Sequence, residues 1–213
     1  MIELYTWNTS NGRKISIALE EMRIPYTVHA IDIYAGDQFS DAFNAITPNN
    51  KIPAIRDTET GQTLFESGAI LLYLAEISGQ FLASDPAKRW ETIQWVMWQM
   101  GGFGPILGQA AHFLHYNAGA SDYSANRFLT ETRRLYAVLD GQLAGREFIV
   151  GEYSIADIAV WPWVSRFEHQ KIDLEEFPCV LDWYVRVAGR SAVQKGYGVP
   201  DVTERPAMPH PNP

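Results

Sequence analysis

Two short segments carry residue types that could bind a small, charged, peptide-like molecule. The first, Lys51-Ile52-Pro53, places a proline at the mouth of a short apolar strand. An X-Pro bond there can be cis, which would leave the backbone N–H and C=O of Ile52 facing outward. An extended peptide could then pair with Ile52 as an added strand. The alternative is a trans proline on an edge strand, and the spacing alone favours neither.

The second segment, Glu66-Ser67, stands at the start of an amphipathic helix. The first turn of a helix has unpaired N–H groups and a partial positive charge, so it attracts a carboxylate. The Ser67 hydroxyl could donate a further hydrogen bond to that carboxylate, and Glu66 could hold an ammonium group beside it. The alternative is that one of these two side chains only caps the helix.

A third segment, Trp7 to Arg13, joins the first predicted strand to the first predicted helix. It places Thr9, Ser10 and Asn11 at a helix N-terminus. Hydroxyl and amide groups in that position can donate hydrogen bonds to a thiolate and lower its pKa. One of the three is also expected to cap the helix.

These three segments can form one site only if the fold brings them together. The pattern of residues in the first part of the chain predicts such a fold. The expected elements are strands over 2–6, 26–33, 52–56 and 63–65 and helices over 14–22, 39–46 and 67–77. The strand–helix–strand unit supplies a parallel pair of strands and the later hairpin an antiparallel pair. We therefore expect an α/β domain with a mixed four-strand sheet.

The rest of the chain predicts helices alone. A long helix over 87–116 should kink at Gly101–Pro105, where proline removes a hydrogen bond. A second helix covers 123–143, and Ser154 with Asp157 forms a capping box that opens another. The predicted domains are 1–78, the α/β domain, and 86–199, an all-α domain, followed by a proline-rich tail over 200–213 that is extended or disordered.

The composition of the chain excludes several classes of partner and of site. The net charge of -8 and pI of about 5.1 argue against nucleic acid as a partner. The chain lacks the apolar run of about eighteen residues that a transmembrane helix needs, and its start lacks the features of a signal peptide. Cys179 is the single cysteine, which excludes an internal disulfide and a Cys-rich zinc site and fits the cytoplasm. Thiol chemistry would therefore use a thiol brought by the ligand, and no metal site is predicted.

In their order and spacing, these segments resemble the cytosolic glutathione transferases over residues 1–195. The resemblance rests on Asn-Lys-Ile-Pro-Ala-Ile at 50–55, Glu-Ser-Gly-Ala-Ile at 66–70 and Ser-Ile-Ala-Asp at 154–157. In detail the chain is most similar to the bacterial nu class and to a related yeast regulatory prion protein. The family implies a thioredoxin-like N-terminal domain that binds glutathione, and a homodimer.

The resemblance also implies roles for individual residues. Thr9 and Asn11 would face the glutathione sulfur as the catalytic pair, with Ser10 as a competitor. The binding contacts that it implies for the first glutathione are Ile52 beside cis-Pro53 for the cysteinyl unit, Glu66 and Ser67 for the γ-glutamyl end, and Gln38 and Lys51 for the glycyl end. A second glutathione would be reached by Arg133 or by its neighbour Arg134, and the alternative for either arginine is a solvated helix face.

The activity that this resemblance implies is disulfide-bond reduction without a protein cysteine. A glutathione thiolate would attack a disulfide, and a second glutathione would resolve the mixed disulfide. Peroxidase activity and weak transferase activity are expected beside it. The alternative is a non-catalytic, glutathione-binding regulatory protein with the same fold.

Overall fold

The computed structural model describes residues 1–209, which divide between two compact units. The first unit is Met1–Leu82 with Gly189–Arg205. The second unit is Ala83–Ala188 and takes up the chain again at Pro206. Compared with the predicted domains, the main difference is that residues 189–205 pack in the first unit.

The first unit contains a mixed four-stranded sheet, as predicted, in the order β2-β1-β3-β4. Its strands are β1 (Ile2–Thr6), β2 (Tyr26–Ala30), β3 (Ala54–Asp57) and β4 (Thr63–Phe65). β1 is parallel to β2 and antiparallel to β3, which is antiparallel to β4. β3 begins two residues later than predicted and so excludes Pro53, which has no N–H to donate to a sheet.

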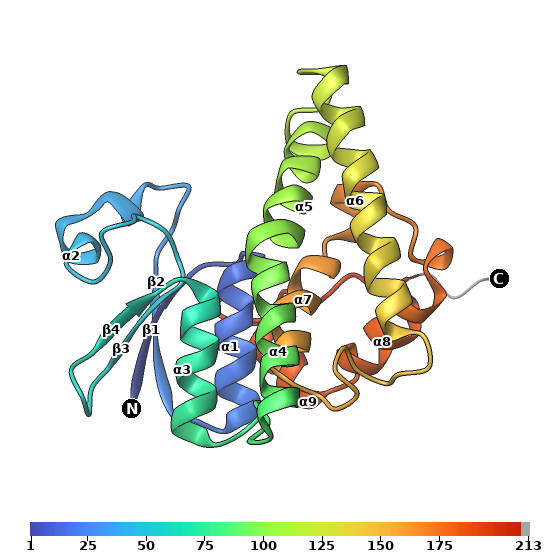
Figure 1. Cartoon of the computed structure of the whole chain (residues 1–213). Coiled ribbons are helices and arrows are strands. Elements are labelled where there is room, and N and C mark those ends of the chain that lie inside the picture. Colours follow the sequence, from blue (N-terminus) through green and yellow to red (C-terminus); the bar gives the residue numbers. More distant parts are fainter. Residues whose placement is uncertain (210–213) are drawn as a thin grey trace. The chain divides into compact units, whose positions relative to one another are not determined.

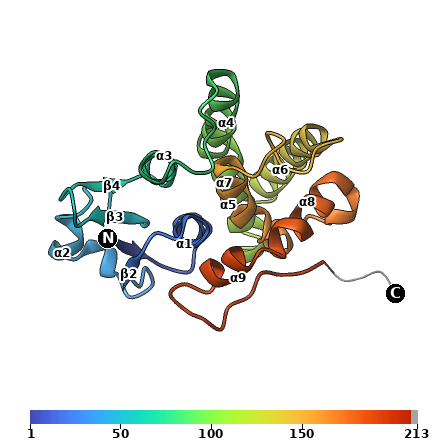
Figure 2. The same ribbon diagram turned by 90° about the horizontal axis from the view of Figure 1, so that it is seen from below.

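Helices cover both faces of this sheet. They are α1 (Ser10–Met22), α2 (Asp41–Asn44) and α3 (Ser67–Ser78), and a further helix of this unit, α9 (Ser191–Tyr197), packs against α1. α1 and α3 lie side by side against one face, where Leu4, Ile55 and Leu71 are buried (Figures 1 and 2). On the other face, Phe43 of α2 lies against Tyr5 of β1, with 6.2 Å between ring centroids. Side chains alternate along β1, so it contributes to both layers.

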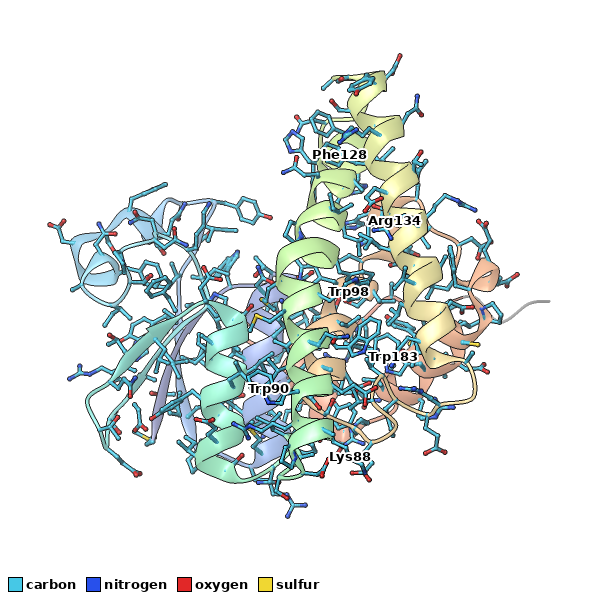
Figure 3. All side chains as sticks on the ribbon, viewed as in Figure 1. Lys88, Trp90, Trp98, Phe128, Arg134 and Trp183 are labelled. Atoms are coloured by element: carbon cyan, nitrogen blue, oxygen red, sulfur yellow. The ribbon has the colours of Figure 1, made fainter. Side chains whose placement is uncertain are left out.

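The second unit is built from helices: α4 (Pro86–Trp98), α5 (Gly104–Ala111), α6 (Asp122–Leu143), α7 (Ile155–Val164) and α8 (Pro178–Ala188). The predicted interruption of the first long helix is a π-helical turn, Gln99–Phe103, between α4 and α5 (Figure 1). Trp161, Trp183 and Tyr136 are fully buried in this unit, and Trp183 is labelled in Figure 3. Across residues 1–209, no helix combines the length and apolar character needed to cross a membrane.

Asp157 is the polar centre of the second unit. It completes the predicted capping box, because its Oδ2 accepts from the Ser154 backbone N–H at 2.9 Å and from the Ser154 hydroxyl at 3.2 Å. Its Oδ1 accepts from the backbone N–H of Ile149 at 3.0 Å and from Nε1 of Trp183 at 2.9 Å. Burial raises the pKa of Asp157 to about 6, and these hydrogen bonds act in the opposite direction.

The proline-rich tail was predicted to be extended or disordered. Up to Arg205 it belongs to the first unit. There the Glu204 carboxylate contacts the buried guanidinium of Arg13 and accepts from Nδ2 of Asn8 at 3.0 Å. This part of the tail is therefore anchored by polar contacts, and the last four residues of the predicted tail, 210–213, lie outside the described residues.

A close approach between α1 and α9 gives a first testable prediction. A Cβ added to Gly196 would lie 2.6 Å from both the Cα and the N of Ile17. Because these are backbone atoms, the two helices would have to move apart. We expect Gly196→Ala to lower the free energy of unfolding by about 1–3 kcal/mol, measured by urea denaturation.

Gly141→Ala is the matched control for that substitution. Gly141 lies within α6, and a Cβ added to it would meet no atom within 4 Å. Alanine is the better helix former, so this variant should gain about 0.5–1 kcal/mol. Equal stability of the two variants would contradict the tight α1–α9 contact.

Candidate functional site

Three loops of the first unit converge on a pocket of about 160 Å³. They are the turn between β1 and α1, the loop before β3, and the turn between β4 and α3. The lining residues are Asn11, Asn49, Lys51, Ile52, Pro53, Phe65, Glu66 and Ser67. The fold therefore assembles one cavity from the three segments that the sequence singled out.

The loop before β3 supplies Lys51, Ile52 and Pro53. The Ile52–Pro53 peptide bond is cis. Because β3 begins at Ala54, the backbone of Ile52 lies outside the sheet ladder and in the pocket wall. Lys51 is exposed at the same wall and places a positive charge there.

The start of α3 supplies Glu66 and Ser67. Glu66 is the N-cap residue but makes no capping hydrogen bond through its side chain. Its φ of 68° is a conformation that side-chain-bearing residues rarely adopt and that is often found at ligand sites. Ser67 is buried, and its Oγ accepts a hydrogen bond from Nζ of Lys14 at 3.3 Å. The carboxylate and the hydroxyl thus meet at the N-terminus of a 12-residue helix.

The turn between β1 and α1 supplies Asn11. α1 begins at Ser10, earlier than the predicted start at Lys14. Thr9 is its N-cap, and its Oγ1 accepts from the backbone N–H of Gly12 at 3.1 Å. An accepting hydroxyl keeps its own proton, so Thr9 can still donate to another group. Ser10 is buried, whereas Asn11 lines the pocket.

Two further predicted residues lie elsewhere. Gln38 stands in a short 3₁₀ turn, Asp37–Phe39, and its Nε2 donates to the backbone oxygen of Ile33 at 3.3 Å. Arg133 lies on α6 in the second unit. Its guanidinium forms an ion pair with Glu176, with Nη1 3.1 Å from Oε1. The pocket lining of the first unit therefore includes neither of these side chains.

Sequence reasoning missed Asn49 and Phe65 as lining residues and Lys14 behind the pocket. Lys14 is completely buried. Burial lowers its pKa well below the ordinary value, and the Glu66 carboxylate opposes that shift. The usable signal was its spacing, because Lys14 lies four residues before Ala18 on the buried face of α1.

The charges of the pocket suit a short zwitterionic peptide. Helix N–H groups and the Ser67 hydroxyl can take one carboxylate, Lys51 a second, and Glu66 an ammonium group. Within residues 1–209, no cluster of three or more His, Cys, Asp or Glu side chains could hold a metal ion. The one thiol of the chain, Cys179, lies on α8 in the second unit.

Comparison with known proteins agrees with this arrangement. The glutathione S-transferase N-terminal domain matches residues 10–77 and the C-terminal domain matches residues 122–186. The disulfide-bond oxidoreductase YfcG of Escherichia coli K12 is 48% identical over 198 residues, covering 90% of this chain and 92% of YfcG.

Two solved structures are similar to this chain over most of its length. A glutathione transferase from Pseudomonas putida, with one glutathione disulfide bound per subunit, has a TM-score of 0.89 and 43% identity, covering 93% of this chain and 91% of that one. One from Burkholderia graminis, with two glutathione molecules bound per subunit, has a TM-score of 0.87 and 43% identity, covering 93% and 88%. The chain therefore belongs to the glutathione S-transferase family, as its ordered motifs predicted.

Proposed function

We propose that this protein is a glutathione-dependent disulfide-bond reductase of the nu-class type. The observation that carries the proposal is a pocket with complementary charges for a zwitterionic peptide and no protein thiol in its lining. The similarity to YfcG supports the reaction. The bound molecules of the two bacterial relatives, glutathione disulfide and paired glutathione, support the ligand.

The proposed binding mode assigns each part of glutathione to a wall of the pocket. The γ-glutamyl ammonium binds Glu66, and its carboxylate binds Ser67 with the first turn of α3. The cysteinyl unit pairs with the backbone of Ile52, and the glycyl carboxylate lies near Lys51. Gln38 stays a prediction for the glycyl end, since its side-chain amide is bonded to Ile33.

The proposed reaction uses two glutathione thiols in turn. Asn11 and Thr9 donate hydrogen bonds to the first sulfur and favour its thiolate. That thiolate attacks one sulfur of a disulfide, so a mixed disulfide forms and a thiolate leaves. A second glutathione thiolate attacks the mixed disulfide, which yields glutathione disulfide and releases the other thiolate. Arg133 stays a prediction for the second glutathione, where it would exchange its pairing with Glu176 for a ligand carboxylate.

Reduction of hydroxyethyl disulfide by glutathione tests the proposal. Turnover is followed in a coupled assay that recycles glutathione disulfide, and it should exceed the uncatalysed rate. Absence of turnover in a protein that a glutathione matrix retains would favour the alternative, a regulatory binding protein.

The lone cysteine gives a second prediction. Cys179→Ala should leave turnover of hydroxyethyl disulfide unchanged, because the reacting thiols come from glutathione. Burial, with the carboxylates of Asp140 and Asp182 nearby, raises the pKa of the Cys179 thiol and makes it a poor nucleophile. Loss of activity in this variant would refute the ligand-thiol mechanism.

The expected homodimer is a third prediction. Trp90 and Met97 share one face of α4 and are 68% and 47% exposed, as side chains at a subunit contact would be in an isolated chain. Sedimentation velocity should give about twice the mass of 24.0 kDa. Trp90→Glu should shift the protein toward the monomer, while Lys88→Glu on the same helix should not.

A further inference from the structure

One asparagine side chain joins the pocket loop to the segment around α2. Asn50 stands directly before Lys51, and its Nδ2 donates to the backbone oxygen of Gln38 at 3.0 Å and to Oδ1 of Asn44. Its φ of 52° lies in the left-handed region, which asparagine tolerates better than most side chains. Asn49 and Lys51, on either side, line the pocket. Asn50 itself is outside that lining, so it acts between two segments of the chain.

A bland explanation is that Asn50 only closes a surface loop. The segment that it holds argues for more, because packing fixes this segment weakly. Within residues 31–46, all of which the structure describes, Phe43 is the one buried side chain. Where few apolar side chains are buried, local opening costs little, so the remaining polar links carry more of the load. The position of the turn that contains Gln38 therefore depends on the Asn50 amide.

That turn has an acceptor that the protein leaves unfilled. Nε2 of Gln38 donates to Ile33, as described above, but Oε1 of Gln38 is buried and makes no hydrogen bond within residues 1–209. Buried polar atoms normally have a partner, so this oxygen is suited to an N–H group of a ligand or to a water molecule. Because Asn50 bonds the Gln38 backbone, the unfilled acceptor lies near the Lys51 end of the pocket.

The opposite end of the pocket is supported independently of Asn50. Glu66 and Ser67 lie at the start of α3, which packs against α1. Lys51, by contrast, is exposed and lies in a loop, one residue after Asn50. Loss of the Asn50 amide would therefore disturb the Gln38 turn and the positive charge of Lys51, and would leave the α3 end in place.

We propose that Asn50 is a positioning residue that makes the pocket select the glycyl end of glutathione, because it fixes the Gln38 turn and Lys51 relative to each other. The inference rests on the proposed function, since it takes glutathione as the ligand and Lys51 as the partner of the glycyl carboxylate. It assigns to Asn50 one end of that ligand. Closure of a surface loop alone would affect all parts of the ligand equally.

A pair of ligands separates the two roles. The methyl ester of the cysteinyl carboxyl group of γ-glutamylcysteine lacks both the glycyl N–H and the glycyl carboxylate. Asn50→Gly removes the amide, and glycine adopts a positive φ without strain. We expect the Kd for glutathione to rise about tenfold in Asn50→Gly and the Kd for the ester to stay unchanged, both measured by titration calorimetry. Equal weakening of the two ligands, or no change in either, would overturn the positioning role.

Two further variants keep the test decisive. Arg23→Gly is the matched control, because Arg23 is an exposed residue at the end of α1 with a similar φ of 55°, and both Kd values should match the wild type. Asn44→Ala removes one of the two acceptors and leaves the backbone of Asn50 untouched, so it also replaces Asn50→Gly if that variant fails to fold. Its Kd should rise about threefold for glutathione alone. A rise shared by the ester, or no rise, would overturn the inference.

The wild-type protein separates this inference from the proposed function. Glutathione bound no more tightly than the ester would overturn the role of Asn50 and leave the reductase proposal intact. Tighter binding of glutathione without reduction of disulfides would overturn the reductase proposal alone. Binding of neither ligand would overturn the assignment of the pocket and the role of Asn50 together.

Discussion

Asp157→Ala is expected to lower the free energy of unfolding of the second unit by at least about 3 kcal/mol. The substitution leaves three buried N–H donors without their acceptor, those of Ile149, Ser154 and the Trp183 indole. Each unsatisfied buried donor costs about 1–3 kcal/mol. The loss also opens the start of α7, because the capping box disappears.

Urea unfolding at pH 8 measures this effect. That pH lies well above the pKa of Asp157, about 6, so the carboxylate is ionised and accepts all of its hydrogen bonds. Tryptophan fluorescence reports on the unfolding of the second unit, since every tryptophan except Trp7 lies in residues 83–188. Asp182→Ala, an exposed aspartate on α8, is the control and should change stability little. A similar midpoint for the two variants would contradict the central role of Asp157.

Asn11→Ala is expected to lower kcat/KM for hydroxyethyl disulfide on the order of 100-fold, the usual effect of removing one donor aimed at a developing anion. Asn11 is the member of the predicted trio that lines the pocket. Without its donor, the bound glutathione thiol should hold its proton more tightly. The pH–rate profile should therefore move to higher pH, and a loss of folding alone would not produce that shift.

Variants of the neighbouring residues Thr9 and Ser10 serve as controls for Asn11→Ala. Thr9→Ser keeps both the helix cap and a hydroxyl, so it should retain most activity, whereas Thr9→Ala should lose activity and also about 1 kcal/mol of stability. Ser10→Ala should leave the pH–rate profile in place. A large loss in Ser10→Ala with little effect of Asn11→Ala would transfer the role of sulfur ligand to Ser10.

The sheet and the pocket could be predicted because local signals encode them. Proline before a strand, an acidic residue and a serine before an apolar helix, and polar residues in the first turn each have a local physical cause. The order and spacing of these motifs along the chain then indicated which family fold they belong to. The start of α1 was misplaced because apolar periodicity begins at Ile15, whereas the helix begins at the Thr9 cap.

Other features depend on contacts between distant parts of the chain. The spacing of Lys14 along α1 could indicate that it is buried, but a lysine is ordinarily exposed, and no local pattern predicts that Ser67 and Glu66 would lie near it. The return of Gly189–Arg205 to the first unit depends on partners such as Ser16, whose hydroxyl donates to the backbone oxygen of Gly196 at 2.7 Å.

That return has a consequence for how the protein is made. On the ribosome, the helical unit between the two parts of the first unit is synthesised almost completely before α9 emerges. The packing around α1 is therefore complete only when the last stretch of the chain has been made. Buried Arg13 then gains its hydrogen bond to the backbone oxygen of Tyr197, at 3.2 Å, and its contact with Glu204. The first unit is therefore a discontinuous folding unit, and a gene fragment that stops at Leu82 encodes its core without α9 and the segment that follows.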